Sequence, residues 1–576
     1  MDQQRPFLYL TLFFLGFLIW STWQQEHAPK PVTPAGQIEL NSTNNSSQNN
    51  NNSMPSGSSI SAGTSVDNAG VAPVNDSGAS NNVDAQQIHI KTDVLDLIIS
   101  TQGGTIVQAD LPTHPISLEE QDKATRIIDK EQKYAAQSGL SAGGANLAPN
   151  HTTNFSTLNT EYILKERQNR LEVPLTWSNG SGLTVTKNFI FERGSFLVKQ
   201  IQKVDNQTGN IWRGNEYLEL THKEYSRTGG LLSGAIAYVG PAYYKNKYQK
   251  IDFDDIQDGD LKDLTTKAEL DALTEDEREE RFIKGGWIAM LKHYFISAWV
   301  PVKENENTYY TRVSEVNNNY IIGVKSPVKQ VEPGSNTEFT SQLYVGPTDQ
   351  ASLAKISEGL DLTVDYGMFA FVSKPIFAVM SYINRNIVSN WGWTIILLTI
   401  FIKLIFFYPS AMSYKSMAKM KKFQPQIKAL GDKYKGDPQG KQKATMALFK
   451  KEKINPLGGC LPMLIQMPVF MGLYWVIQES VELRQAPWIL WYKDLSIMDP
   501  FWVLPLIFGA SMWLQQKLNP PAMQDPMQQK IFMYLPLVFT VMFIVFPAGL
   551  VLYWVVNNIL SIAQQWFINK KIIGDT

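Results

Sequence analysis

Lys403 has the most unusual chemical setting in the sequence, because it is the one charged residue in the apolar run 391–408. A lysine deep in a membrane-spanning segment costs about 2.5–3.5 kcal/mol to insert and usually faces water or an ion partner. The five apolar runs of the C-terminal part contain no Asp, Glu or His that could neutralise it. We therefore expect Lys403 to face a wet cavity in a helix bundle. The alternative is a side chain that extends to the lipid headgroups.

Uncharged polar residues in the same runs are candidates to line this cavity. Thr399 lies one helical turn before Lys403, Gln466 lies in the run 460–477, and Asn557 lies in the run 548–568. The alternative role of such side chains is to hydrogen-bond one helix to another, which is common in membrane bundles.

A second set of residues suits contact with apolar partners. Methionine is unbranched and adaptable, so a surface rich in methionine and aromatic side chains accommodates varied apolar shapes, although plain packing is the more common use of such residues. The candidates are Met463, Met467, Phe470, Met471, Phe539 and Met542.

Motifs of soluble enzymes are nearly absent from the sequence. The single cysteine, Cys460, excludes an internal disulfide and a multi-cysteine metal site. One GxSxG pattern occurs at 139–143, but a nucleophile elbow needs a strand before it and a helix after it. The flanking residues predict a glycine-rich surface loop instead. We expect no catalytic residue, cofactor or metal.

Six apolar segments predict a polytopic α-helical membrane protein. Residues 1–23 form an uncleaved anchor with its N-terminus inside, a cleaved signal peptide being the alternative. The other five segments are 391–408, 460–477, 501–516, 531–546 and 548–568. Six spans of about 20 residues occupy a minority of the 576 positions, so the mean hydropathy of −0.18 does not contradict them.

Lysines set the expected orientation of these segments. Positions 415–453 hold twelve lysines and three acidic residues, so by the positive-inside rule this part is cytoplasmic. Apolar spacings of three and four predict a helical hairpin over 412–455. Both chain ends, including the tail 571–576, then lie in the cytoplasm. The candidate basic residues, which suit anionic lipid or RNA phosphates, are Lys415, Lys419, Lys421, Lys422, Lys428, Lys433 and Lys435.

The region before these helices has three parts. Residues 24–85 are rich in Asn, Ser, Gly and Pro and predict a disordered linker. Residues 86–350 alternate apolar and polar positions between turn signals, which predicts a large all-β domain of two packed sheets outside the cytoplasm. A helix is expected within 273–285, and an interfacial amphipathic helix over 366–388. The helical core then covers 389–570.

Several long motifs resemble the YidC/Oxa/Alb family of membrane insertases of the Gram-negative type. They include NWGWTIILLTIFIKLIFF, KINPLGGCLPMLIQMPVFMGLYWV and FPAGLVLYWVVNN in the helical part, and KGGWIAMLKHYFISAWVP in the β domain. The resemblance covers nearly the whole chain except the linker. It implies a bacterial inner-membrane chaperone and insertase, not an enzyme, with a periplasmic β-supersandwich and a bundle of five helices.

The resemblance also implies roles for individual residues. It places Lys403 and Thr399 in a hydrophilic groove, although the family's usual residue at the first position is arginine, whose planar contacts lysine lacks. Tyr553 and Trp554 match a tyrosine pair, so the tryptophan departs from the family pattern. Gln466, Met467 and Phe470 match positions that contact substrate.

The implied partners are nascent membrane proteins, the Sec translocon with its accessory subunits, ribosomes held weakly by the cytoplasmic loops, and anionic phospholipids. Two other classes of protein stay open. A membrane-anchored carbohydrate-binding protein predicts clustered carboxylates in the β domain, and a solute transporter predicts carboxylates within the membrane.

Overall fold

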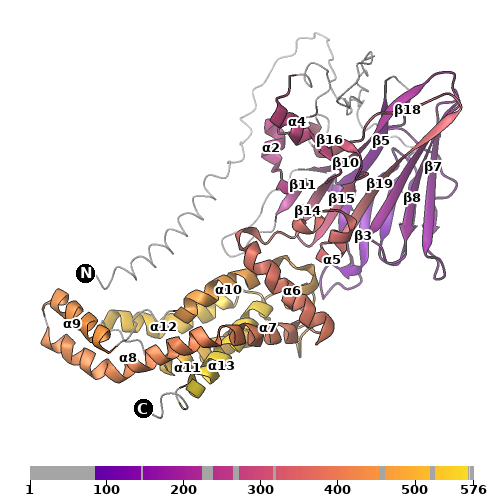
Figure 1. Ribbon diagram of the computed structural model, residues 1–576. Helices are drawn as coiled ribbons and strands as arrows, with labels where there is room; N and C mark the ends of the chain where they lie inside the picture. Colours follow the sequence, from indigo (N-terminus) through magenta and orange to yellow (C-terminus); the bar gives the residue numbers. More distant parts are fainter. Residues whose placement is uncertain are drawn as a thin grey trace, which may run out of the picture.

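The structure is a computed structural model that describes residues 85–143, 147–223, 238–261, 263, 272–314, 319–434, 436–452, 461–518, 526–568 and 570. A β domain and a helical part lie end to end (Figure 1). The expected anchor 1–23, the linker up to residue 84 and the tail 571–576 fall outside the described residues.

The β domain consists of two large sheets, as the alternating sequence pattern predicts. The larger sheet has eleven strands in the order β13-β16-β17-β10-β5-β3-β2-β1-β6, with β4 on β3 and β18 on β10. Its strands are β1 Gln87–Lys91, β2 Asp96–Ser100, β3 Thr105–Pro115, β4 Ala124–Asp129, β5 Ala135–Ala142, β6 Glu161–Ile163, β10 Trp212–Lys223, β13 Phe282–Lys284, β16 Glu306–Ser314, β17 Asn319–Lys325 and β18 Lys329–Val331.

The second sheet has eight strands in the order β12-β11-β14-β15-β19-β9-β8-β7. Apolar side chains from both sheets meet in one buried core, for example Ile88 and Leu97 with Val173 and Phe189. A short helix, α4 Glu275–Arg281, forms where the charged stretch predicts one. The strands are β7 Arg170–Ser178, β8 Leu183–Glu192, β9 Leu197–Asn206, β11 Val239–Lys245, β12 Lys247–Lys250, β14 Trp287–Lys292, β15 Phe295–Val300 and β19 Ser335–Pro347.

The GxSxG segment is not the surface loop that the sequence predicts. Residues 139–142 lie in β5, which pairs antiparallel with β10, and Ser141 is buried. Gly139 is needed because the Tyr217 ring lies where a side chain would be, not because the chain turns there. The prediction was wrong because small residues mark close packing as well as turns.

All five apolar runs of the C-terminal part form helices, and the basic segment forms two more. They are α7 Trp391–Ile405, α10 Leu461–Glu479, α11 Val503–Leu518, α12 Pro526–Phe543 and α13 Ala548–Ile568, with the hairpin helices α8 Phe407–Lys433 and α9 Pro438–Lys451. Among the described residues, no single helix meets a length and apolarity standard for crossing a membrane, while Trp391–Ile405 and Phe407–Met417 together meet it across a 67° bend.

α13 contacts α7, α8, α10 and α11, and its inward residues are buried along its length. α6, Ala370–Asn386, is the helix expected over 366–388, and it buries Ile376, Met380 and Ile383 against the bundle. The Ser373 hydroxyl donates to the Gly472 carbonyl of α10 at 3.0 Å. The apolar face of this helix therefore covers other helices, and its expected interfacial location stays a prediction.

A lysine is buried between the two sheets of the β domain. The Lys187 ammonium donates to the Gly103 carbonyl at 2.6 Å and to the Ser138 carbonyl at 2.8 Å. It also lies 5.3 Å from the centre of the Phe155 ring. Burial lowers the pKa of Lys187 to about 7, opposed by the charge of Glu216.

This lysine predicts a pH dependence of β-domain stability. Between a pH of about 7 and a pH near the ordinary lysine pKa of 10.5, the unfolded chain binds more protons than the folded chain. The free energy of unfolding should therefore rise with pH across that window. We expect Lys187→Met to flatten the rise in melting temperature, measured by scanning fluorimetry of the full chain in detergent. Lys199→Met, on exposed β9 surface, should leave it unchanged. An unaltered rise in Lys187→Met would contradict the assignment.

Candidate functional site

Lys403 lies in the last turn of α7 and is 9 % exposed. Its ammonium donates to the Ser561 hydroxyl at 2.7 Å, and that hydroxyl donates to the Asn557 carbonyl at 2.7 Å. The Asn557 amide in turn donates to the Gln466 side-chain oxygen at 3.2 Å. A chain of hydrogen bonds thus joins α7, α13 and α10, and we call these four residues the polar chain.

The polar chain brings together three residues that the sequence singled out and one that it did not. Among the ion pairs of the described residues none involves Lys403, so its described partner is an uncharged hydroxyl. Ser561 was missed, although its position one helical turn after Asn557 places it on the same face of α13. That periodicity is the signal that could have found it.

Further polar residues of α13 bind neighbouring helices. The Asn558 amide donates to the Ser511 hydroxyl of α11 at 3.0 Å. The Gln564 amide donates to the Phe407 carbonyl at 3.2 Å, next to the bend between α7 and α8. The interhelical role that was the alternative for Asn557 is therefore present in Asn557, which bonds Gln466 of α10, and in Asn558.

The other predicted groove residues have apolar or internal contacts. Thr399 is fully buried, and its hydroxyl donates to the Ile395 carbonyl of its own helix at 2.7 Å. Tyr553 is 1 % exposed. The ring centre of Trp554 lies 5.2 Å from the ring centre of Phe470 and 6.1 Å from that of Phe543. Tyr553 and Trp554 thus lie in an aromatic layer between α10, α12 and α13.

The predicted apolar contact residues differ in exposure. Met467 is 44 % and Met542 is 39 % exposed, whereas Phe470, Met471 and Phe539 are half-buried. The side chain of Met463 lies outside the described residues. Large exposed apolar side chains continue along α12, so this helix presents an apolar outer face. They are Met533, Leu537, Val538 and Val541.

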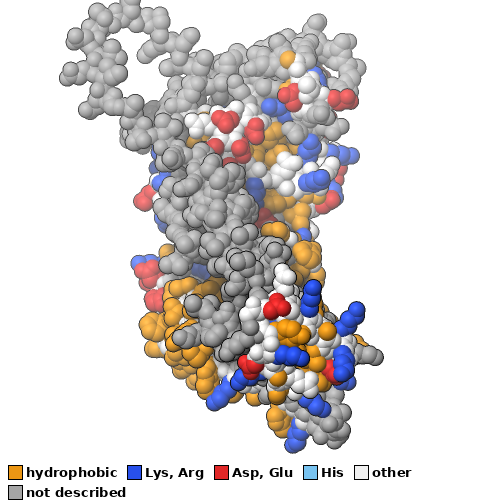
Figure 2. All heavy atoms as spheres, turned by 90° about the vertical axis from the view of Figure 1, so that its left-hand side faces the viewer, with side chains coloured by type: hydrophobic (Ala, Val, Ile, Leu, Met, Phe, Trp, Pro, Cys, Tyr) orange, Lys and Arg blue, Asp and Glu red, His pale blue; other side chains and the backbone are white. Residues whose placement is uncertain are grey.

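The helical hairpin carries exposed basic side chains. α8 and α9 are separated near Gly436, as the GDPQG break predicts. Blue Lys and Arg side chains gather over this end of the molecule (Figure 2). The side chains of Lys419 and Lys421, and the whole of Lys435, lie outside the described part. The exposed members of the predicted set are Lys415, Lys422, Lys428 and Lys433.

Arg484, just after α10, connects the helical part to the β domain. Its guanidinium donates to the Pro115 carbonyl at 2.7 Å and the Ile116 carbonyl at 2.9 Å, at the end of β3. The same group lies 5.3 Å from the centre of the Phe295 ring. The Gln485 amide also donates to Pro115 at 3.1 Å. We call this contact the joint, and no sequence pattern indicated it.

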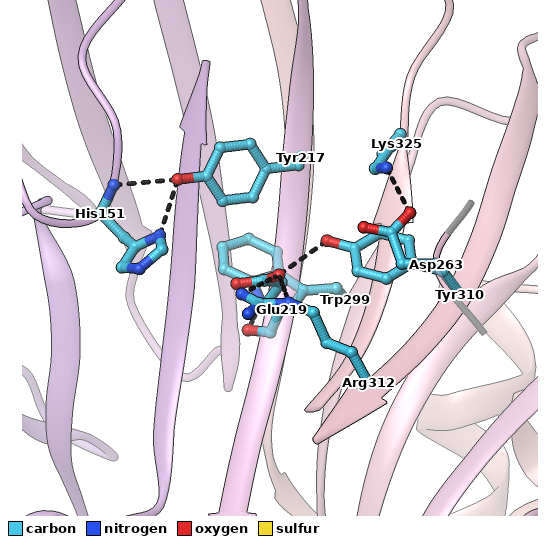
Figure 3. A network of polar contacts seen from close by, with 8 residues as sticks. All are labelled: His151, Tyr217, Glu219, Asp263, Trp299, Tyr310, Arg312 and Lys325. Carbon is cyan, nitrogen blue, oxygen red and sulfur yellow. Dashed lines mark hydrogen bonds and ion pairs between the residues drawn. The ribbon is translucent and has the colours of Figure 1, made fainter. Parts of the chain in front are cut away.

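The β domain contains a second polar cluster away from the joint. The Glu219 carboxylate accepts from Tyr310 at 2.8 Å and forms an ion pair with Arg312 at 3.0 Å, and Lys325 pairs with Asp263 at 2.6 Å. Figure 3 shows these side chains together with His151, Tyr217 and Trp299.

Folding therefore brings carboxylates together, but each faces a cation. Burial by itself raises the pKa of Glu219, yet the charges of Arg312 and His151 and the hydrogen bond from Tyr310 outweigh it, so the pKa lies below its ordinary value. Paired, buried carboxylates of this kind are the pattern of a structural network. The cluster gives a carbohydrate site no specific support.

The bundle of apolar helices around Lys403 and the β-sandwich joined to it define a two-part membrane protein. Residues 87–379 match the YidC periplasmic domain, and residues 382–575 match the 60Kd inner membrane protein family. A membrane protein insertase YidC of Thioalkalivibrio sulfidiphilus is 44 % identical over 582 residues, covering 99 % of both chains. That of Methylococcus capsulatus is 42 % identical over 579 residues, covering 100 % of this chain and 99 % of the relative.

The chain belongs to the YidC family of membrane protein insertases, which confirms the resemblance seen in its motifs. A solved structure of an active YidC insertase with its first transmembrane domain resolved is 17 % identical, covers 83 % of this chain and 92 % of that chain, and gives a TM-score of 0.38.

The joint predicts a local change when Arg484 is removed. Arg484→Ala loses both hydrogen bonds to the turn after β3. A hydrogen bond to a charged group contributes about 1.5–3 kcal/mol to stability, and less where the bond is exposed, as the one to Ile116 is. We expect faster hydrogen exchange at the Ile116 amide, which bonds the Lys123 carbonyl within that turn. Lys493→Ala, an exposed change nearby, should not alter it. Equal exchange in all three proteins would show that the joint does not hold the turn.

Proposed function

We propose that this protein inserts and helps to fold integral membrane proteins in a bacterial inner membrane, alone and with the Sec translocon. The membership of the family supports an insertase of nascent membrane proteins with a periplasmic domain. The single observation that carries the mechanism is the polar chain, which holds the Lys403 ammonium inside an apolar bundle.

The mechanism uses Lys403 as the charge of a hydrophilic groove. An uncharged hydroxyl partner leaves the positive charge available to the carboxylates or carbonyls of an incoming hydrophilic segment. Polar groups along the path lower the cost of taking that segment out of water, which is several kcal/mol for each unpaired polar group. Gln466 and Asn557 supply such groups beside Lys403.

The apolar part of the substrate then leaves sideways into lipid. Exposed Met467 and Met542, with half-buried Phe470, Met471 and Phe539, supply adaptable apolar contacts for a helix of varying sequence. Burial of the substrate helix in lipid drives insertion, and the membrane potential assists the outward movement of acidic segments.

The orientation follows from the lysines of the hairpin. With α8 and α9 in the cytoplasm, the chain has six spans, both termini lie inside, and the β domain lies in the periplasm. The exposed lysines then meet anionic lipid headgroups and the RNA of a weakly held ribosome. The β domain is available to the accessory subunits of Sec.

Removal of the charge at position 403 tests this mechanism. Lys403→Ala should strongly reduce insertion of a single-span protein with an acidic translocated tail, because its carboxylates lose their attracting group. Lys403→Arg should retain insertion, since it keeps the charge. Protease protection of the tail in liposomes made with the purified protein measures both.

Lys374→Ala changes an exposed lysine of α6 and serves as the matched control. Full insertion by Lys403→Ala, with normal folding of all variants, would show that the charge of Lys403 is not needed for insertion.

The basic hairpin predicts a salt-dependent interaction. The triple variant Lys422→Ala, Lys428→Ala, Lys433→Ala should sediment several-fold fewer ribosomes with proteoliposomes, because each lysine that neutralises an RNA phosphate releases a counterion and so favours binding. The difference should disappear at high salt. A triple variant of exposed β-domain lysines, Lys91, Lys199 and Lys203, should bind like the unmodified protein. Equal binding by the hairpin variant at low salt would refute this role.

A further inference from the structure

Residues 486–502, which we call the outer loop, connect α10 with α11 and expose an unusual number of large apolar side chains. Leu490 is 76 %, Phe501 is 62 % and Trp502 is 53 % exposed. A soluble loop would present polar side chains instead. The other exposed large apolar side chains of the outer loop are Ile489, Ile497 and Met498.

The outer loop buries a carboxylate and pairs several of its polar groups within itself. The Asp499 side chain is buried, and it accepts from the Tyr492 hydroxyl at 3.0 Å, the Leu504 amide at 2.8 Å and the Phe501 amide at 3.1 Å. The Trp488 amide donates to the Tyr492 carbonyl at 2.8 Å. The loop thus buries its Asp499 carboxylate while several of its large apolar side chains face outward, which is unusual for a loop made for water.

The outer loop is fixed to the ends of the helices. The amides of Ala548 and Gly549 donate to the carbonyls of Ile497 and Leu495 at 2.7 and 2.9 Å, at the start of α13. At the start of α7, the side-chain amide of Asn390 donates to the Pro487 carbonyl at 3.0 Å. The apolar side chains therefore have a defined position at one end of the bundle.

The apolar surface of the loop continues along a helix. α11 begins directly after Trp502, and its Leu506 and Ile507 are 61 % and 43 % exposed. Trp393, in the first turn of α7, is 46 % exposed and packs edge-on against Trp488 at 6.0 Å. Tryptophan is enriched where a bilayer meets water, and irregular backbone enters that region when its polar groups are paired within the protein.

We propose that the outer loop is a lipid-binding surface whose Leu490 and Phe501 side chains insert into the outer edge of the bilayer. Its occupant is lipid, because the surface is continuous with the outward apolar face of α11. Lys493, exposed on the same loop, then lies among the headgroups. The inference goes beyond insertion and requires only that the bundle lies in a membrane.

Site-directed spin labelling tests the proposal. Cys460→Ser is combined with Leu490→Cys, Phe501→Cys, Lys493→Cys or Leu158→Cys, the last an 89 % exposed site in the β domain. The labelled full chains are reconstituted in vesicles of phosphatidylethanolamine and phosphatidylglycerol. Power saturation compares access of oxygen, which concentrates in lipid, with access of a water-soluble nickel chelate.

We expect the ratio of oxygen to nickel access to be several-fold higher at 490 and 501 than at 158, and lower at 493 than at 490. Ratios at 490 and 501 equal to that at 158 would overturn the proposal. Labels shielded from both reagents would also overturn it, because they would show a protein partner instead of lipid. The readout does not depend on insertion activity, so failure of one proposal leaves the other testable.

Discussion

The burial of the Lys403 ammonium among uncharged groups constrains the whole helical part. A buried cation without hydrogen bonds is too costly to keep, so neighbouring helices have to supply oxygen atoms to it or to its partners. α13 does so with Ser561 and Asn557, one helical turn apart, and α10 adds Gln466. These bonds fix the rotation of α13 relative to α7, which apolar packing alone would leave less specific.

The same requirement to pair polar groups recurs at the ends of the bundle. Asp499 accepts from the Phe501 and Leu504 amides, and Arg484 donates to the Pro115 and Ile116 carbonyls at the end of β3. In the β domain Lys187 pairs with the Gly103 and Ser138 carbonyls between the sheets. The Arg484 and Lys187 contacts join segments that lie far apart in the sequence, so these polar contacts set the position of parts that apolar burial stabilises. Asp499 instead pairs with residues within eight positions of itself and fixes the local shape of its loop.

Much of the architecture could be predicted because it depends on local periodicity. The five apolar runs form helices, the alternating region forms two sheets, and the GDPQG break separates α8 from α9. Where the local pattern was ambiguous the prediction failed, as in the 139–143 segment. There Gly139 makes room for the Tyr217 ring of the neighbouring strand, a contact that a single strand's sequence does not reveal.

The sequence by itself determined most of the element types, the isolation of Lys403 from acidic residues and the family, because these depend on residue identity and short-range spacing. Only the tertiary structure decided which side chain accepts the hydrogen bond of the Lys403 ammonium. Ser561 lies 158 positions from Lys403, and nothing in either segment specifies the other. The joint was decided in the same way, since Arg484 binds the Pro115 carbonyl 369 positions away. The attachment of the outer loop was also decided by packing, because its Ile497 and Leu495 carbonyls accept from the amides that begin α13.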